Sequence, residues 1–197
     1  MILIRHGRTA WNLAGRYQGW TDVPLDDVGR TQAHLLGQYL QREAPQLGPY
    51  ALLASSDLSR ARATAEAIGR AVDLDPVVFS DLRERKVGEW EGLTREEVVK
   101  HYGESLTCSK GELRPPGGET WGEVRLRVTA CIRRLLRRIR SGESLLIVGH
   151  GGAWRMAIEG LAKKEGLVGQ SVPVASLTVL EGPPWRVLLL GRRPFGD

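Results

Sequence analysis

The chain has 197 residues, of which 42% are hydrophobic and 26% are charged, a composition typical of a globular domain and unlike that of a disordered chain. No apolar run is long enough to span a bilayer, and the N-terminus lacks a basic segment followed by an apolar one. We therefore expect neither a membrane span nor a signal peptide. The net charge of +5 leaves nucleic acid, membrane surfaces and acidic small molecules open as partners.

The chain has two cysteines, Cys108 and Cys131, which are far apart and lack the spacing of a metal site. A disulfide framework is therefore not expected, and a reducing cytoplasm is the predicted location.

The first half of the chain alternates strands with helices. Apolar runs predict short strands, and helical periodicity bounded by Gly, Pro and capping residues predicts helices. Ser55, Ser56 and Asp57 are the predicted caps of the second helix, and the first is expected to end at Pro45, Gly48 and Pro49. The predicted elements are a strand at 2–5, an irregular stretch at 6–25, a helix at 27–44, a strand at 50–54, a helix at 58–72 and a strand at 76–79.

Two capping boxes mark helix starts in the second half, Thr94 with Glu97 and Thr120 with Glu123. A loop at 103–119 separates these two helices, and such loops often act as lids. The elements expected after it are an arginine-rich helix to about 140, a strand at 144–148, a helix at 153–161 and strands near 175–180 and 185–190.

This alternation predicts a single α/β domain over residues 1–197. We expect a three-layer α/β/α sandwich around a mostly parallel sheet, with an antiparallel edge formed by the last strands. A small lid-like insertion is predicted at about 93–119.

The excess positive charge lies mainly in the helix that follows Thr120. Its arginines alternate with apolar residues at helical spacing, which indicates an amphipathic helix with a solvated basic face. Nucleic-acid binding is disfavoured because no aromatic residue follows Trp121 in this segment. The arginines are Arg125, Arg127, Arg133, Arg134, Arg137, Arg138 and Arg140.

Polar groups follow three of the predicted strands. Arg5-His6-Gly7 ends the first, Ser56-Asp57 with Arg60 and Arg62 follows the second, and His150-Gly151-Gly152 follows the strand at 144–148. If these strands are neighbours, their carboxyl ends face one crevice. Guanidinium groups and helix N-termini bind phosphate oxygens, and an imidazole can act as a nucleophile, so the combination suits a phosphoryl group.

The order of these segments resembles that of the histidine phosphatase superfamily, which includes the cofactor-dependent phosphoglycerate mutases. The match extends from residue 2 to residue 152, and the combined pattern is specific although each piece is weak alone. The matching segments are Leu3-Ile4-Arg5-His6-Gly7, Trp11-Asn12, Ser56-Asp57-Leu58 with Arg60 and Thr64-Ala65, Leu82-Arg83-Glu84, Gly88 with Trp90-Glu91-Gly92, Pro116-Gly117-Gly118-Glu119 and Gly149-His150-Gly151.

The resemblance implies a role for each matching residue. His6 would become phosphohistidine, while Arg5, Arg60 and His150 would hold the phosphoryl oxygens and stabilise the transition state. Asn12 would add a hydrogen bond.

The Gly151 backbone is a further implied phosphate ligand. Glu84 would protonate the leaving oxygen and then activate water, and only the family pattern selects it over Asp81, Glu89 and Glu91.

Some residues carry alternative interpretations. His6 and His150 could bind zinc, but no third ligand is evident from local spacing, so no metal site is predicted. Arg8 stands where the family most often has an acidic residue, which puts substrate preference in doubt.

Residues near the loop at 103–119 bear on the substrate. Arg85, Lys86 and Arg114 would favour substrates that carry extra negative charge. Trp11 and Trp20 are expected in the walls and core.

The sequence therefore predicts a phosphomonoester hydrolase that acts on a small phosphorylated metabolite through phosphohistidine. The first alternative is a cofactor-dependent phosphoglycerate mutase, and the second is a non-catalytic phospholigand- or nucleic-acid-binding protein. No cofactor is expected unless the mutase alternative holds, when 2,3-bisphosphoglycerate would be needed. Nucleic acid and membrane are not expected as partners, and only the relatives suggest a homodimer.

Overall fold

The computed structural model describes residues 1–103, 113–162 and 172–195. Six strands and six α-helices alternate along them, with two short 3₁₀ turns at Ser80–Leu82 and Gly88–Trp90. The elements are β1 (Ile2–Arg5), α1 (Ala10–Leu13), α2 (Asp27–Leu47), β2 (Tyr50–Ser55), α3 (Ser59–Val72), β3 (Val77–Val78), α4 (Arg95–Tyr102), α5 (Trp121–Leu136), β4 (Ser144–Gly149), α6 (Gly151–Ala162), β5 (Leu177–Glu181) and β6 (Arg186–Arg192).

The strands form one sheet in the order β3-β2-β4-β1-β5-β6. The four strands from β3 to β1 are parallel, and β5 and β6 add antiparallel partners at the β1 side. Arg5 pairs with Gly149, and Ser55 pairs with Val148, so β1, β2 and β4 end at the same edge of the sheet. The three strands are therefore neighbours, which is the condition for the polar residues after them to face one crevice.

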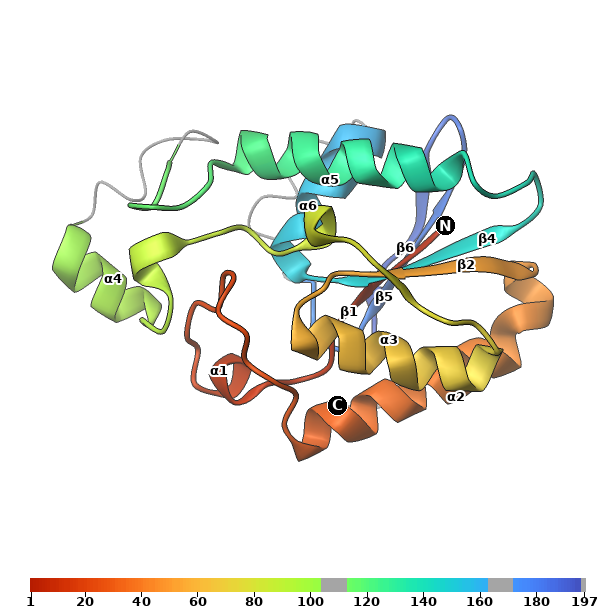
Figure 1. The fold of residues 1–197 in the computed structure, drawn as a ribbon, viewed down its shortest axis with the longest axis horizontal. Helices are drawn as coiled ribbons and strands as arrows, with labels where there is room; N and C mark the ends of the chain where they lie inside the picture. The colour runs from red at the N-terminus through yellow and green to blue at the C-terminus, as the bar shows by residue number, and fades with distance from the viewer. Residues whose placement is uncertain (104–112, 163–171, 196–197) are drawn as a thin grey trace.

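Helices cover both faces of the sheet, with α2 and α3 on one face and α5 and α6 on the other (Figure 1). Alternate residues of β1 face the two layers. Leu3 joins the core under α5 and α6, while Ile2 and Ile4 join the core against α2 and α3. The structure confirms the three-layer α/β/α sandwich.

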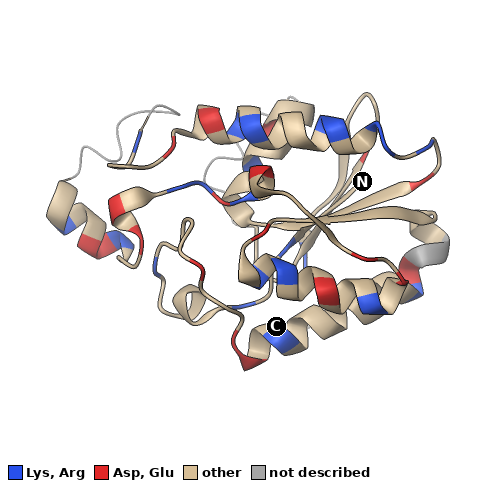
Figure 2. Ribbon diagram, viewed as in Figure 1, with Lys and Arg blue, Asp and Glu red and all other residues tan. Residues whose placement is uncertain are grey.

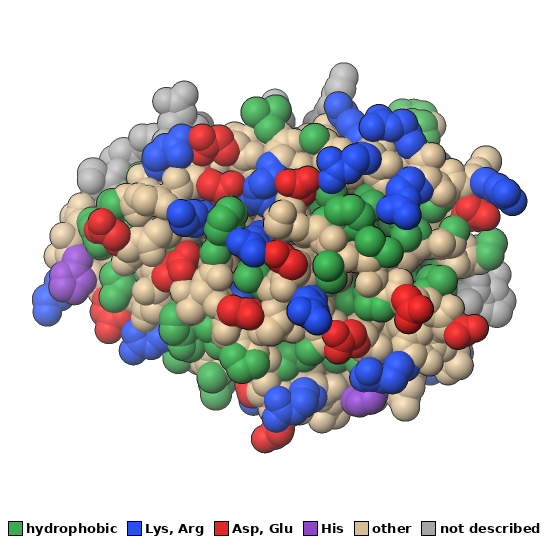
Figure 3. All heavy atoms as spheres, viewed as in Figure 1, with side chains coloured by type: hydrophobic (Ala, Val, Ile, Leu, Met, Phe, Trp, Pro, Cys, Tyr) green, Lys and Arg blue, Asp and Glu red, His purple; other side chains and the backbone are tan. Residues whose placement is uncertain are grey.

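Charged side chains of both signs are interspersed over the outer helices and over the face shown in Figures 2 and 3. Ion pairs such as Arg30 with Asp27 and Arg62 with Glu66 connect some of them. In the described ranges, no helix is both long and apolar enough to cross a membrane.

Three local predictions are wrong. The stretch at 6–25 contains the one-turn helix α1, whose capping box joins Thr9 and Asn12. Helix α2 continues past the predicted end at residue 44 to Leu47, and its C-cap is Gly48, the second of the expected stop residues, whose φ of 78° lies in the region that favours glycine.

The cap of α3 also differs from the prediction. The Ser59 N–H, in the first turn of α3, donates to Asp22 Oδ1 at 2.7 Å, and the N-cap residue Leu58 has no side-chain cap. Asp57 instead pairs with Arg83 through two hydrogen bonds, at 2.7 and 2.6 Å. The cap therefore comes from a residue distant in sequence, which local patterns do not reveal.

Both predicted capping boxes are present, at Thr94 and Thr120. Helix α4 lies beyond the end of the sheet and packs through Val98 against Trp90 (Figure 1). Residues 104–112 of the predicted lid, Cys108 among them, lie outside the described residues. The other cysteine, Cys131, is a free, buried thiol.

Candidate active site

Three chain segments converge where β1, β2 and β4 end. Backbone hydrogen bonds continue the ladder one residue beyond the strands. The N–H of His6 donates to Gly149 O at 3.0 Å, and that of Ser56 donates to Val148 O at 3.0 Å. His6, Ser56 and His150 are therefore fixed by the sheet itself at one crevice.

The two histidines lie side by side at the bottom of this crevice. Their ring centroids are 5.2 Å apart, and the side chains are only 2% and 1% exposed. Nδ1 of His6 lies 2.7 Å from Gly7 O, which can only accept, so Nδ1 carries the proton. The other ring nitrogen, Nε2, then has a lone pair available for attack.

Both histidines are held in the neutral form. Burial lowers the pKa of His6 well below 6.5, and the nearby guanidinium groups of Arg60 and Arg5 lower it further. Burial, Arg60 and His6 lower the pKa of His150 in the same direction. A neutral imidazole is the form that a nucleophile requires.

Arg60 supplies the first buried cation. It lies in the first turn of α3, is 1% exposed, and donates to Thr21 O and Gly19 O at 2.9 Å each. Its Nε has no partner among the described residues. Burial lowers the pKa of Arg60 to about 10, so the group stays charged near neutral pH.

Arg5 supplies the second cation at the end of β1. It donates to Val172 O, and its Nε also has no partner in the part of the chain that the structure describes. Burial lowers the pKa of Arg5 to about 10. Two charged guanidinium groups thus flank the neutral His6, and both line the cavity around it.

Asn12 reaches the cavity from α1. Its Oδ1 accepts from the Thr9 N–H at 3.1 Å, as the second half of the capping box. The two N–H donors of its amide find no acceptor among the described residues and can donate toward the cavity. The capping box therefore occupies Oδ1 of Asn12 and leaves its amide nitrogen to face the cavity.

The two glycines at the start of α6, Gly151 and Gly152, have different surroundings. A Cβ on Gly151 would lie 3.2 Å from Arg5 Nε, so Gly151 packs against that guanidinium. Gly152, rather than Gly151, lines the cavity. A Cβ on Gly152 would lie 2.4 Å from Glu84 Oε1, so only glycine leaves room for that carboxylate.

Glu84 is held at the N-terminus of α6. Its carboxylate accepts from the N–H groups of Arg85, Gly152 and Ala153 at 2.8, 2.9 and 3.0 Å. It is the one acidic side chain among the described residues that line the cavity.

The three rival acids have other partners. Asp81 pairs with Arg134, Glu89 accepts from the Tyr102 hydroxyl, and Glu91 accepts from Trp20 N and Thr21 Oγ1. The structure therefore brings Glu84, and none of these three, to the cavity.

The cavity has a volume of about 590 Å³, enough for a phosphoryl group with a sizeable leaving group. Its cationic lining consists of Arg5, Arg16, Arg60, Arg85, Arg95 and Arg155. Its apolar and aromatic lining consists of Tyr17, Val87, Trp90, Val98, Val99, Leu113 and Trp121. No three His, Cys, Asp or Glu side chains in the described ranges are grouped to hold a metal ion.

The sequence matches the family model of the histidine phosphatase superfamily (branch 1) over residues 1–190. The chain belongs to this superfamily. The finding confirms the predicted family, and the phosphatases among its relatives support the predicted enzyme class.

Relatives of this histidine phosphatase include both phosphatases and mutases. A 2,3-bisphosphoglycerate-dependent phosphoglycerate mutase 2 from Gloeobacter violaceus is 35% identical over 162 residues, which cover 79% of this chain and 72% of the relative. A metal-independent phosphoserine phosphatase from Arabidopsis thaliana is 34% identical over 160 residues, 79% of this chain and 65% of that protein.

Solved structures support the same assignment. A mycobacterial glucosyl-3-phosphoglycerate phosphatase, determined with VO3, superposes with a TM-score of 0.86 at 29% identity. The match covers 97% of this chain and 98% of the mycobacterial chain.

Sequence reasoning missed several cavity arginines. Arg155 lies six residues after the end of β4, and Arg60 lies five residues after the end of β2, so a similar spacing after a strand end was a usable signal. Arg16 and Arg95 come from a loop and from the start of α4, and nothing local marks them.

Of the residues expected to favour anionic substrates, only Arg85 lines the cavity. Lys86 lies over the Trp20 ring, and Arg114 pairs with Glu123. Arg8 pairs with Asp26 at 2.8 Å, outside this cavity.

The buried histidines predict a pH-dependent stability. Because the folded pKa values of His6 and His150 lie below 6.5, the unfolded chain binds protons that the folded chain does not, as the pH falls below about 6.5. The free energy of unfolding should therefore fall, by up to about 1.4 kcal/mol per pH unit for each histidine.

Urea unfolding between pH 7 and 5 measures this slope. His6→Asn should reduce it, while the exposed His34→Asn serves as the control and should not. Equal slopes in both variants and the unchanged protein would contradict burial of a neutral His6.

Proposed function

We propose that this histidine phosphatase hydrolyses phosphomonoesters of small metabolites by transferring the phosphoryl group to His6. The observation that carries the proposal is the neutral imidazole between two buried guanidinium groups, with Nδ1 bonded to Gly7 O and Nε2 available. This arrangement supports attack on phosphorus, because the nucleophile is unprotonated while fixed positive charge surrounds it.

In the first step, Arg5, Arg60 and the Asn12 amide bind the phosphoryl oxygens. His150 adds an Nδ1–H donor, with the Ser56 hydroxyl, 2.9 Å from Nε2, donating to that nitrogen. Nε2 of His6 attacks phosphorus, and the ester oxygen leaves with a proton delivered by Glu84.

In the second step, Glu84 takes a proton from water, and the resulting hydroxide attacks phosphohistidine. The products are inorganic phosphate and free His6. Neither step uses a metal or an organic cofactor, because the arginines supply the positive charge.

The cavity lining favours a substrate with further negative charge. Six arginines face one carboxylate, more positive charge than a single phosphoryl dianion balances. The relatives include enzymes named for glucosyl-3-phosphoglycerate and phosphoserine, both of which carry a carboxylate. We place the reaction in the cytoplasm, where such metabolites are made.

A phosphoglycerate mutase is the second candidate, because the Gloeobacter relative is named as one. A mutase must keep water away from phosphohistidine while its intermediate reorients. The cofactor-dependent mutases carry an inserted segment between the Trp90-Glu91-Gly92 region and the Pro-Gly-Gly-Glu motif, whereas this chain has only residues 93–115 there. The short interval favours hydrolysis.

Rapid quench with ³²P-labelled substrate should trap a phosphoenzyme that is labile in acid and stable in base. His6→Ala should abolish the label, because Nε2 of His6 is the attacking atom in this proposal, whereas Nε2 of the neighbouring His150 is hydrogen-bonded to the Ser56 hydroxyl. Label that persists in His6→Ala would assign the nucleophile elsewhere.

Activity should survive dialysis against EDTA with less than a twofold loss, because guanidinium groups replace the metal's charge. Vanadate should inhibit as a mimic of the transferring group. A requirement for added Mg²⁺ or Zn²⁺ after chelation would refute this proposal.

Glu84→Gln should lower kcat about 100-fold or more on alkyl phosphates and less than about tenfold on 4-nitrophenyl phosphate. General-acid catalysis contributes roughly 10²–10⁴-fold, mostly when the leaving oxygen is basic. The matched control is Glu89→Gln, because the Glu89 carboxylate accepts a hydrogen bond from the Tyr102 hydroxyl and lies outside the cavity. Equal losses on both substrates would mean that another group donates the proton.

A product assay separates phosphatase from mutase. With 3-phosphoglycerate, phosphate release should exceed formation of 2-phosphoglycerate, whether or not 2,3-bisphosphoglycerate is added. Isomerisation that outruns phosphate release and depends on the bisphosphate would establish the mutase instead.

A further inference from the structure

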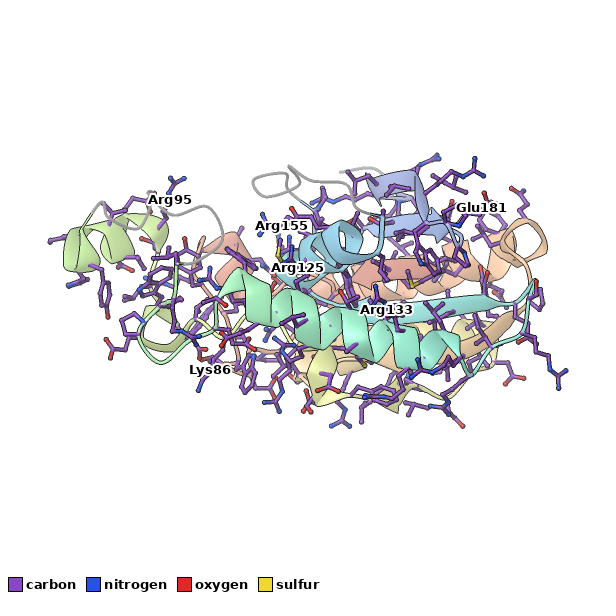
Figure 4. All side chains as sticks on the ribbon, turned by 90° about the horizontal axis from the view of Figure 1, so that it is seen from above. Lys86, Arg95, Arg125, Arg133, Arg155 and Glu181 are labelled. Atoms are coloured by element: carbon purple, nitrogen blue, oxygen red, sulfur yellow. The ribbon has the colours of Figure 1, made fainter. Side chains whose placement is uncertain are left out.

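Arg127 is not part of a solvated basic face, as its position in the arginine-rich helix suggested. Its side chain is 16% exposed and extends from α5 toward the segment that carries Glu84. By contrast, Arg125 and Arg133 on the same helix are exposed (Figure 4). One arginine of this helix therefore has a different environment from its neighbours.

All five N–H donors of the Arg127 guanidinium are used. Nη1 donates to Asp81 O at 2.9 Å and to Arg83 O at 3.0 Å, and Nη2 donates to Glu84 O at 3.2 Å. Nε and Nη2 bind the Glu119 carboxylate at 3.0 and 2.8 Å. A lysine has three donors on one atom and cannot reproduce this planar set.

Glu119 extends the connection to the other side of Glu84. Its carboxylate accepts from the Lys86 N–H at 2.9 Å, its N–H donates to Lys86 O at 2.9 Å, and its carbonyl accepts from Arg85 Nε at 2.7 Å. Arg127 and Glu119 thus form hydrogen bonds with the backbone at several positions from residue 81 to residue 86. Residues 83–86 of this segment follow a 3₁₀ turn and have no regular secondary structure, so their course depends on such bonds.

The position of the Glu84 carboxylate is tightly constrained by the start of α6. Its carboxylate fits between the N–H groups of Gly152 and Ala153, with no space for a Cβ at Gly152. Its carbonyl is fixed by Trp20 Nε1 at 2.8 Å as well as by Arg127. A small shift of this backbone would move the carboxylate relative to the leaving oxygen.

We propose that Arg127, paired with Glu119, is a positioning residue that sets the Glu84 carboxyl for proton transfer. Arg127 does not line the cavity and acts through the backbone carbonyls of residues 81, 83 and 84. The proposal rests on the proposed function, in which Glu84 is the proton donor. Misplacement of a catalytic group by about 1 Å can cost about 10²-fold in rate.

The test compares Arg127→Lys with Arg133→Met in the full-length protein. Arg127→Lys should lower kcat on glycerol phosphate by about 10- to 100-fold, leave kcat on 4-nitrophenyl phosphate within about threefold, and change KM little. Arg133→Met should change neither. The dependence of rate on leaving-group pKa, measured over a series of aryl phosphates, should steepen in Arg127→Lys alone.

A double mutant then isolates the connection to Glu84. If Arg127 acts through Glu84, adding Arg127→Lys to Glu84→Gln should cause little further loss on glycerol phosphate. If the losses of kcat from the two substitutions multiply fully in the double mutant, the proposal is overturned. It is also overturned if Arg127→Lys lowers kcat equally on both substrates, or lowers it no more than Arg133→Met does. A general loss of fold would appear as a lowered Tm with both substrates affected.

If Arg127→Lys does not fold, Trp20→Phe supplies the second variant, because it removes the other hydrogen bond to Glu84 O. It should shift the leaving-group dependence in the same direction, and an unchanged dependence would overturn the proposal. Failure of the proposed function is recognised separately, by loss of selectivity in Glu84→Gln or by a phosphoenzyme that survives His6→Ala.

Discussion

The hydrogen bond from Nδ1 of His6 to the carbonyl of its neighbour Gly7 is the interaction on which the site depends. It fixes the tautomer, while burial and two guanidinium groups keep the ring unprotonated. In the proposed reaction, the same guanidinium groups attract the phosphoryl dianion. One set of charges would therefore both keep the imidazole unprotonated and bind the group that it attacks.

The fold supports this interaction through close backbone packing. A Cβ on Gly7 would lie 2.4 Å from Gly29 O, so the turn after β1 can rest against α2 only because residue 7 is glycine. The Gly7 N–H donates to Thr64 Oγ1 at 3.2 Å, which ties the same turn to α3. His6, the proposed nucleophile, therefore lies in a turn that contacts α2 and α3 directly after β1.

The strands, and the polar residues that follow them, were predictable because both are marked by local sequence signals. The polar residues after β1, β2 and β4 pointed to one crevice on the condition that these strands are neighbours, and the sheet order meets that condition. Features set by distant contacts were not predictable. Asp22 caps α3 from 37 residues away, and Arg127 is partly buried against backbone carbonyls that no helical period reveals. Arg16 and Arg95 reach the cavity from irregular or peripheral segments.

Every role proposed for His6 requires a neutral imidazole with its proton on Nδ1. NMR of the protein labelled with ¹⁵N in its histidines measures this state, and His6→Asn identifies the signals. We expect an Nδ1–H tautomer that shows no protonation between pH 7 and 5.5. An imidazole at His6 that titrates near 6.5, or that carries its proton on Nε2, would contradict it.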